Sequence, residues 1–114
     1  MSNEISKKIL EEMLDLSAEV ITYIEKTRVN VSIQNQLIRS VSSIGANYSE
    51  AQDASSKKDF INKIYIAKKE AAETIYWLKL IVRLGDSSEE LFVFESKTRR
   101  FVLLLQKIIN SSKN

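Results

Sequence analysis

The chain has 114 residues and a formal net charge of +2, and it contains neither cysteine nor histidine. This length suits one domain that buries a core without disulfides, and the absence of cysteine fits a reducing cytoplasm. It also excludes a cysteine nucleophile and a cysteine zinc site. The missing histidine removes the commonest general base and metal ligand. A charge so close to neutral is weak evidence for a polyanion as partner.

The N-terminal segment is expected to form a helix over about residues 4–27. Its apolar residues recur at spacings of three and four and so line one helix face: Ile5, Ile9, Met13, Leu16, Val20 and Ile24. Acidic residues interrupt every apolar run, which excludes a signal peptide and a membrane span. The segment TRVNVSIQN then breaks the pattern, and Asn30 or Ser32 can cap the next helix.

The middle of the chain is expected to form two further helices, over about residues 32–54 and 57–84. The first of these carries an apolar stripe of Ile33, Leu37, Val41, Ile44, Tyr48 and Ala51. The second begins at a sequence that resembles a capping box, with Ser56 as cap and Asp59 in place of the usual Glu or Gln. Gly85 can close it, because glycine tolerates the left-handed conformation that ends many helices.

A fourth helix is expected over about residues 88–111, after a second capping box at Ser87-Ser88-Glu89-Glu90. The chain has no proline and only two glycines, which favours long uninterrupted helices. Because the connections between the four helices are short, sequential neighbours should pack side by side. The sequence therefore predicts an all-α, antiparallel up-down-up-down four-helix bundle that forms a single domain over residues 1–114.

Two segments carry more apolar surface than one bundle can bury. Residues 101–105 are five consecutive apolar residues, so their side chains would point to all sides of a helix. Residues 75–82 are mostly apolar and would also surround the helix. Since a large exposed apolar patch marks an interface, we expect a homo-oligomer. The expected interface residues are Tyr76, Trp77, Leu80, Val102 and Leu104. The alternative is that these aromatic residues complete the core at one end of the bundle.

The central half of the chain, QLIRSVSSIGANYSEAQDASSKKDFINKIYIAKKEAAETIYWLKL, resembles a family of bacterial proteins encoded in intervening sequences of 23S ribosomal RNA genes. The family pattern reads roughly Q-L-R-R-A-x-x-S-I-P-A-N-I-A-E-G, then S-x-K-E-F, then I-A-x-x-x-A-x-E. The matching residues are Gln36, Leu37, Arg39, Ser43, Ile44, Ala46, Asn47, Glu50, Ser56, Lys58, Phe60, Ile66, Ala67, Ala71 and Glu73. The departures are Ile38 for arginine, Gly45 for proline, Ala51 for glycine and Asp59 for glutamate.

The resemblance implies a four-helix bundle that assembles into a closed ring, typically a homopentamer, without enzymatic activity or a cofactor. It thus implies an oligomeric scaffold or adaptor. The accessory variability protein of diversity-generating retroelements is similar to this family, and it binds a reverse transcriptase and nucleic acid through a basic surface. The alternative function is therefore RNA or DNA binding through a basic surface of the oligomer, with a protein partner such as a reverse transcriptase.

Small polar side chains surround Gly45 within the second expected helix. Glycine there weakens a helix by about 1 kcal/mol relative to alanine, so the position predicts a bend or a close approach of another helix. Asn47 and Glu50 share a helix face, and Glu73 of the next helix is a plausible facing partner. These three residues are interpreted either as a polar cluster that binds something or as a hydrogen-bond network that fixes helix register or the subunit contact.

Five cations form the candidate nucleic-acid surface: Arg39, Lys57, Lys58, Lys63 and Lys68. Contacts from such residues to phosphate would be salt-sensitive and largely independent of sequence. Tyr65 and Tyr76 could stack on bases, although tyrosines on helices this apolar also serve as core residues.

Catalytic and metal-binding patterns are missing from the sequence. A di-iron bundle needs Glu-x-x-His pairs, and the nearest feature is Glu70-x-x-Glu73. The serines have no histidine that could act as their base, and there is no glycine-rich phosphate loop. We therefore expect no catalytic residues, no cofactor and no metal site.

Overall fold

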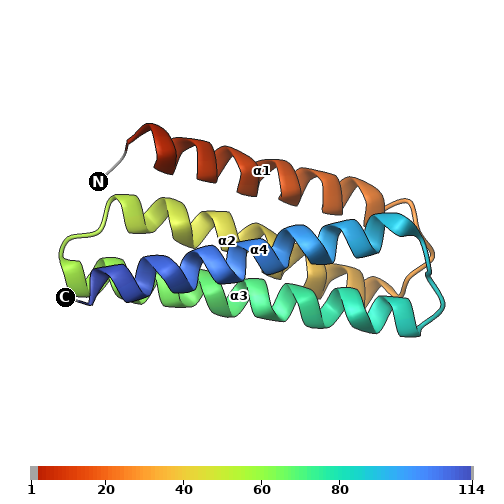
Figure 1. Cartoon of the computed structure of the whole chain (residues 1–114). Coiled ribbons are helices and arrows are strands. Elements are labelled where there is room, and N and C mark those ends of the chain that lie inside the picture. The colour runs from red at the N-terminus through yellow and green to blue at the C-terminus, as the bar shows by residue number, and fades with distance from the viewer. Residues whose placement is uncertain (1–2, 114) are drawn as a thin grey trace.

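The computed structural model describes residues 3–113, and this part of the chain consists of four α-helices without a strand (Figure 1). The helices are α1 (Glu4–Ile24), α2 (Val31–Gln52), α3 (Lys57–Arg83) and α4 (Glu89–Ser112). They lie side by side in a body of 45 × 22 × 21 Å. The α1–α2 and α3–α4 connections lie at one end, and the α2–α3 connection lies at the other (Figure 1). The all-α, four-helix architecture expected from the sequence is confirmed.

Three of the four helices begin at a side-chain cap. Asn3 accepts a hydrogen bond from the Ser6 backbone N–H at 2.8 Å, and Asn30 accepts one from the Ser32 N–H, also at 2.8 Å. The Ser56 hydroxyl accepts from the Asp59 N–H at 3.0 Å, as the first capping box predicts. The prediction of a second capping box is wrong, because Ser88 is the residue that precedes α4 and its side chain makes no cap hydrogen bond to this helix. Its hydroxyl instead contacts the Tyr23 hydroxyl of α1.

Gly85 ends α3 as expected from the sequence. It has a φ of 114°, in the left-handed region that favours glycine. The Gly85 N–H donates to the Val82 carbonyl at 3.1 Å, and the Asp86 N–H donates to the Ile81 carbonyl at 3.3 Å. This pair of bonds is the Schellman pattern, which satisfies carbonyls left unpaired at a helix end. It turns the chain toward α4 and places Asp86 against α1.

The core runs along the axis of the bundle and receives residues from every helix. Its larger members are fully buried and recur at the three- and four-residue spacing seen in the sequence. They are Met13, Val20, Ile24, Leu37, Ile44, Tyr48, Ile64, Leu78, Ile81, Leu91, Leu105 and Ile109. Ile5 is an exception among the expected core residues, since 72% of it is exposed.

Gly45 lies where α1 and α2 approach each other. A β-carbon placed on Gly45 would stand 3.4 Å from the Met13 β-carbon and 3.9 Å from a Leu10 methyl carbon. The helix is unbroken from Val31 to Gln52. Of the two explanations drawn from the sequence, the structure supports the close helix approach, and α2 passes through Gly45 without an interruption.

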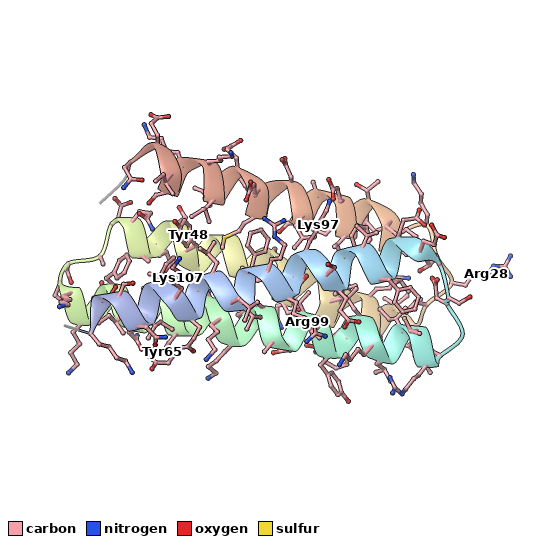
Figure 2. The ribbon with its side chains drawn as sticks, viewed as in Figure 1. Arg28, Tyr48, Tyr65, Lys97, Arg99 and Lys107 are labelled. Carbon is pink, nitrogen blue, oxygen red and sulfur yellow. The ribbon has the colours of Figure 1, made fainter. Side chains whose placement is uncertain are left out.

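The seam between α1 and α4 is the most open of the bundle. α1 packs mainly against α2 and touches α4 only sparsely. Polar contacts cross the seam: Lys97 of α4 points toward α1 and lies 3.1 Å from the Glu19 carboxylate (Figure 2). The Tyr23 hydroxyl also lies 2.9 Å from the Asp86 carboxylate in the α3–α4 connection. Charged and hydroxyl groups thus help to hold α1 in place.

Candidate functional site

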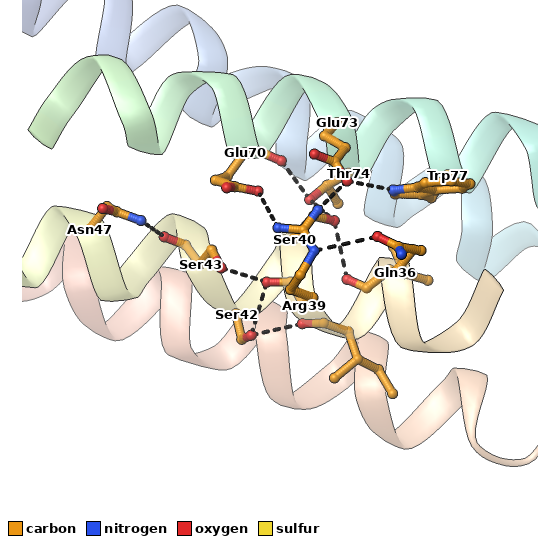
Figure 3. A network of polar contacts seen from close by, with 12 residues as sticks. Gln36, Arg39, Ser40, Ser42, Ser43, Asn47, Glu70, Glu73, Thr74 and Trp77 are labelled. Carbon is orange, nitrogen blue, oxygen red and sulfur yellow. Dashed lines mark hydrogen bonds and ion pairs between the residues drawn. The ribbon is translucent and has the colours of Figure 1, made fainter. Parts of the chain in front are cut away.

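The α2–α3 hairpin carries the largest group of polar contacts, centred on Arg39 (Figure 3). Its guanidinium bonds to the Glu73 carboxylate and lies 3.1 Å from the Glu70 carboxylate. Glu73 also accepts a hydrogen bond of 2.9 Å from the Trp77 indole N–H. Two acids three residues apart on α3 therefore share one cation from α2, and the indole fixes the orientation of the second acid.

Electrostatics within this group follow from its hydrogen bonds. The indole N–H of Trp77, followed by the Arg39 guanidinium, holds the pKa of Glu73 below its usual value of 4.5. The hydrogen bond to Glu73 in turn raises the pKa of Arg39. Both groups are therefore charged across the neutral pH range. Neither is set up to exchange a proton near pH 7, as a general acid or base would need to do.

Beneath Arg39, two buried hydroxyl groups link α2 to α3. The Thr74 hydroxyl donates to the Ser40 hydroxyl at 2.9 Å and also lies 2.8 Å from the Glu70 carbonyl. Ser40 in turn reaches the Leu37 carbonyl at 3.2 Å. Both residues are fully buried, yet their hydroxyl groups are satisfied. A satisfied buried pair of this kind fixes the register of two helices.

The other small polar residues of α2 bond to their own helix. Ser43 donates to the Arg39 carbonyl at 2.6 Å, and Ser42 donates to the Ile38 carbonyl at 2.7 Å. Asn47 donates to the Ser43 carbonyl at 2.9 Å. Each bond spans four residues, the distance at which a short side chain reaches the preceding turn. These bonds account for the run of small polar residues around Gly45.

Asn47, Glu50 and Glu73, which were expected to form one polar cluster, do not bond to one another: Asn47 and Glu73 lie at different places in the network around Arg39, and Glu50 lies outside it (Figure 3). Asn47 bonds within α2, Glu50 lies 2.8 Å from the Lys63 ammonium group, and Glu73 bonds to Arg39 and Trp77. Of the two interpretations of this cluster, these contacts favour the structural one. The pair that the sequence reading missed is Glu70 with Arg39. The signal for it was the three-residue spacing of Glu70 and Glu73 on the side of α3 that faces α2.

The five cations expected to form a nucleic-acid stripe do not share one face. Arg39 and Lys63 are ion-paired to acids across the α2–α3 hairpin, whereas Lys68 reaches across to Gln106 of α4. The hydrogen bond to Glu50 raises the pKa of Lys63. Lys57 and Lys58 are exposed at the start of α3. The expected stripe is thus divided between two seams and one end of the bundle.

A different basic group surrounds Tyr65, near the end of the bundle that holds the α2–α3 connection (Figure 2). The ammonium groups of Lys68 and Lys113 lie 6.0 Å and 5.6 Å from the centroid of its ring. Lys58 and Tyr65 line one surface pocket of about 480 Å³. The sequence analysis placed Lys58 and Lys68 in the five-cation surface and named Tyr65 as a residue that could stack on bases, but it missed Lys113. Lys113 lies 48 positions from Tyr65 and meets it only because α3 and α4 are neighbours.

The expected interface residues are distributed over several sides of α3 and α4. Tyr76 is 59% exposed and meets Trp77 edge to face, with ring centroids 5.0 Å apart. The other four are half-buried: Trp77, Leu80, Val102 and Leu104. Val102 and Leu104 are two residues apart and so point to nearly opposite sides of α4. The most exposed leucine of α4 is Leu103, between them, at 68%.

Within residues 3–113, no group of three or more acidic side chains is placed to hold a metal ion. In the same range, no buried side-chain nitrogen or oxygen lacks a hydrogen-bond partner. None of the helices there combines the length and apolar character that crossing a membrane requires. The polar groups of the α2–α3 hairpin therefore stabilise the contact between the two helices, and no buried group among them awaits a ligand.

The fold and this hairpin define a small four-helix protein whose polar groups join its two central helices. Residues 6–107 match the 23S rRNA-intervening sequence protein family, and the chain belongs to that family. A solved structure of a protein of unknown function from the S23 ribosomal protein family of Bacteroides thetaiotaomicron is similar, with 35% sequence identity and a TM-score of 0.82. The match covers 92% of this chain and 97% of that one. A comparison with curated proteins found no match.

Proposed function

We propose that the protein is a non-enzymatic, homo-oligomeric scaffold or adaptor whose antiparallel bundles assemble into a closed ring. The observation that carries this proposal is the apolar surface left exposed on the isolated chain. Within residues 3–113, nine large hydrophobic residues are exposed, and five of them belong to α3, α4 and the connection between these helices: Tyr76, Leu84, Phe92, Val93 and Leu103. Exposed apolar surface of this kind supports an interaction with other molecules.

The polar contacts support a scaffold more than an enzyme. The hairpin acids are paired with cations, and the pKa shifts of Arg39 and Glu73 keep both groups charged at neutral pH. Such ion pairs join α2 to α3, which suits a subunit that presents surfaces to other molecules. A ring of five copies is the arrangement that the family resemblance favours.

Sedimentation velocity across a range of protein concentrations tests this proposal. A scaffold of this kind sediments as a defined species with several times the chain mass of 13.1 kDa. A single species at 13.1 kDa over the whole range would contradict it. The variant Tyr76→Ser, at an exposed position, provides a first probe of whether the aromatic pair on α3 contributes to the assembly.

The basic group around Tyr65 supports a second candidate function, binding of RNA or DNA. An exposed ring flanked by Lys68 and Lys113 offers a surface on which a base can stack while the ammonium groups contact phosphate. Fluorescence anisotropy with single-stranded RNA and DNA, repeated across a salt series, tests it. We expect binding that weakens with salt and is lost in Tyr65→Ala with Lys113→Ala. Absence of binding even at low salt would contradict it.

A further inference from the structure

Two exposed stripes of opposite charge lie on α1 and α4. The acidic stripe consists of Glu11, Leu14, Asp15 and Ala18, and the basic stripe consists of Ser96, Arg99, Leu103 and Lys107. All eight residues are exposed, and each stripe follows the three- and four-residue spacing that keeps side chains on one helix face. Each one therefore presents a continuous strip of surface to its surroundings.

An exposed leucine forms the centre of each stripe. Leu14 is 53% exposed between Glu11 and Asp15, and Leu103 is 68% exposed between Arg99 and Lys107. The two strips thus match in layout, with a leucine flanked by charges of one sign on α1 and of the other sign on α4. Such a pattern allows apolar contact at the centre and ion pairs at the edges, which is the arrangement found in protein interfaces.

Residues next to the two stripes increase the difference in charge between α1 and α4. Between Ile9 and Ile24, α1 carries four acids and no base, namely Glu11, Glu12, Asp15 and Glu19. From Ser96 to the last described residue the chain carries no acid, and its cations there are Lys97, Arg99, Arg100, Lys107 and Lys113. One acid, Glu95, precedes this run and bonds to Arg99 at 2.5 Å.

Within the subunit, Arg99 of the basic stripe pairs with Glu95 of its own helix and keeps 52% of its side chain exposed. The intramolecular ion pair across the α1–α4 seam uses Glu19 and Lys97. Lys97 and Arg99 are two residues apart, so they point to nearly opposite sides of α4. Figure 2 shows Arg99 and Lys107 on α4, and Lys107 also lines a groove beside the N-terminal end of α1. Among the described residues, no ion pair joins the two stripes of one subunit.

We infer that the acidic stripe of one copy docks on the basic stripe of the next copy, so that Leu14 packs against Leu103 while Glu11 and Asp15 face Arg99 and Lys107. This inference rests on the proposed oligomer and names the surfaces that join its subunits. The contact is heterologous, because it joins two different patches. When this contact is repeated around a symmetry axis and the ring closes, the acidic stripe of every copy is paired with the basic stripe of its neighbour.

Paired charge reversals test the inference. Glu11→Lys with Asp15→Lys makes the acidic stripe basic, and Arg99→Glu with Lys107→Glu makes the basic stripe acidic. Each pair places like charges opposite each other and should weaken assembly by at least about tenfold, since such juxtaposition costs several kcal/mol. All four changes in one chain restore opposite charges, and assembly should return.

A matched control uses Glu25→Lys with Glu89→Lys, which changes the net charge as much as the reversal on α1 does but at two exposed positions outside both stripes. Circular dichroism establishes that each variant is folded, and sedimentation velocity measures its assembly. A salt series on the unaltered protein is a further test of the contact, and it requires no substitution. The screening length falls from about 10 Å at 0.1 M to about 3 Å at 1 M, so the contact should weaken over that range.

Each outcome separates this inference from the proposed function. Loss of assembly in both reversals, recovery in the fourfold variant and an unaffected control support the inference. An oligomer that persists in both reversals overturns the docking of the stripes and leaves the oligomeric scaffold intact. A fourfold variant that stays dissociated shows that the stripes do not face each other. An unaltered protein that is monomeric contradicts the scaffold itself.

Discussion

The hydroxyl of Tyr23 on α1 lies 2.9 Å from the carboxylate of Asp86, 63 residues away in the α3–α4 connection. Asp86 in turn accepts a hydrogen bond of 3.1 Å from the Ser88 backbone N–H. The Tyr23 ring packs edge to face on Phe94, with centroids 5.8 Å apart. These contacts hold α1 to α4 at the end of the bundle where the seam between them is otherwise open. Burial raises the pKa of Tyr23, so its hydroxyl stays protonated and can donate at neutral pH.

Tyr23→Phe tests this contact, because it removes the hydroxyl and keeps the ring on Phe94. We expect the free energy of unfolding to fall by about 1–2 kcal/mol, as for a partly buried hydrogen bond to a charged group. Chemical denaturation measures the change. Tyr65→Phe is the matched control, since Tyr65 is exposed, and it should have little effect. Equal stability of the two variants would show that the Tyr23 hydroxyl contributes nothing.

Removing the indole N–H from Glu73 should change the titration of that carboxyl. Trp77→Phe keeps an aromatic ring but loses the donor that contributes most to the lowered pKa of Glu73. We therefore expect the pKa of Glu73 to rise toward its usual value of 4.5. NMR titration of the side-chain carboxyl reports it directly. An unchanged pKa in the variant would show that Arg39 alone sets it.

The sign of the associated pH effect follows from the same shift. A carboxyl with a lowered pKa in the folded state adds stability above its unfolded pKa. That stability is lost as the pH falls below about 4.5 and through the folded pKa. Glu73→Gln should therefore be less stable than the unaltered chain near pH 7, by about 1 kcal/mol or less, because the pair is partly exposed. The two proteins should converge in stability as the pH falls through the folded pKa of Glu73.

Replacing Arg39 should weaken the α2–α3 hairpin. Arg39→Met keeps the apolar part of the side chain but leaves Glu70 and Glu73 without their shared cation. We expect a loss of about 1 kcal/mol, since 47% of the Arg39 side chain is exposed and solvent screens the ion pair. Lys63→Met provides a control that breaks a single ion pair at the edge of the same hairpin. A smaller loss in Arg39→Met than in this control would contradict the central role of Arg39.

Substitutions at Gly45 test whether the contact between α1 and α2 leaves room for a side chain at this position. An alanine β-carbon would lie 3.4 Å from the Met13 β-carbon, which is an ordinary contact, so Gly45→Ala should gain up to about 1 kcal/mol of helix stability. Gly45→Leu should lose more than about 1 kcal/mol, because its larger side chain pushes the helices apart. Thermal melting compares them. A destabilising alanine would mean that the helices tolerate no side chain at all.

The sequence predicted the helices well because apolar spacing and caps act locally. The expected bounds differ most at the end of α1, which stops at Ile24 instead of near residue 27. There the Thr27 hydroxyl bonds to the Ile24 carbonyl at 2.7 Å, in the chain that leads to α2. Asn30, Ser56 and Gly85 play the roles that their residue types indicate.

The candidate site was harder to predict, because its contacts join distant parts of the chain. Arg39 was taken as a surface cation, yet its partner Glu73 lies 34 residues away and was assigned to another cluster. Residues 87–90 were taken as a capping box, but the N-cap residue Ser88 makes no cap bond, and its hydroxyl contacts that of Tyr23, 65 residues away. The type of a residue does not indicate which of several partners it chooses, and only the packing of the helices decides this.

The mass of the protein in solution tests the central claim most directly. Sedimentation velocity at low salt should show one assembled species of several times 13.1 kDa, which the reversal of either charged stripe dissociates. A species that stays at 13.1 kDa as the protein concentration rises would contradict the scaffold that we propose.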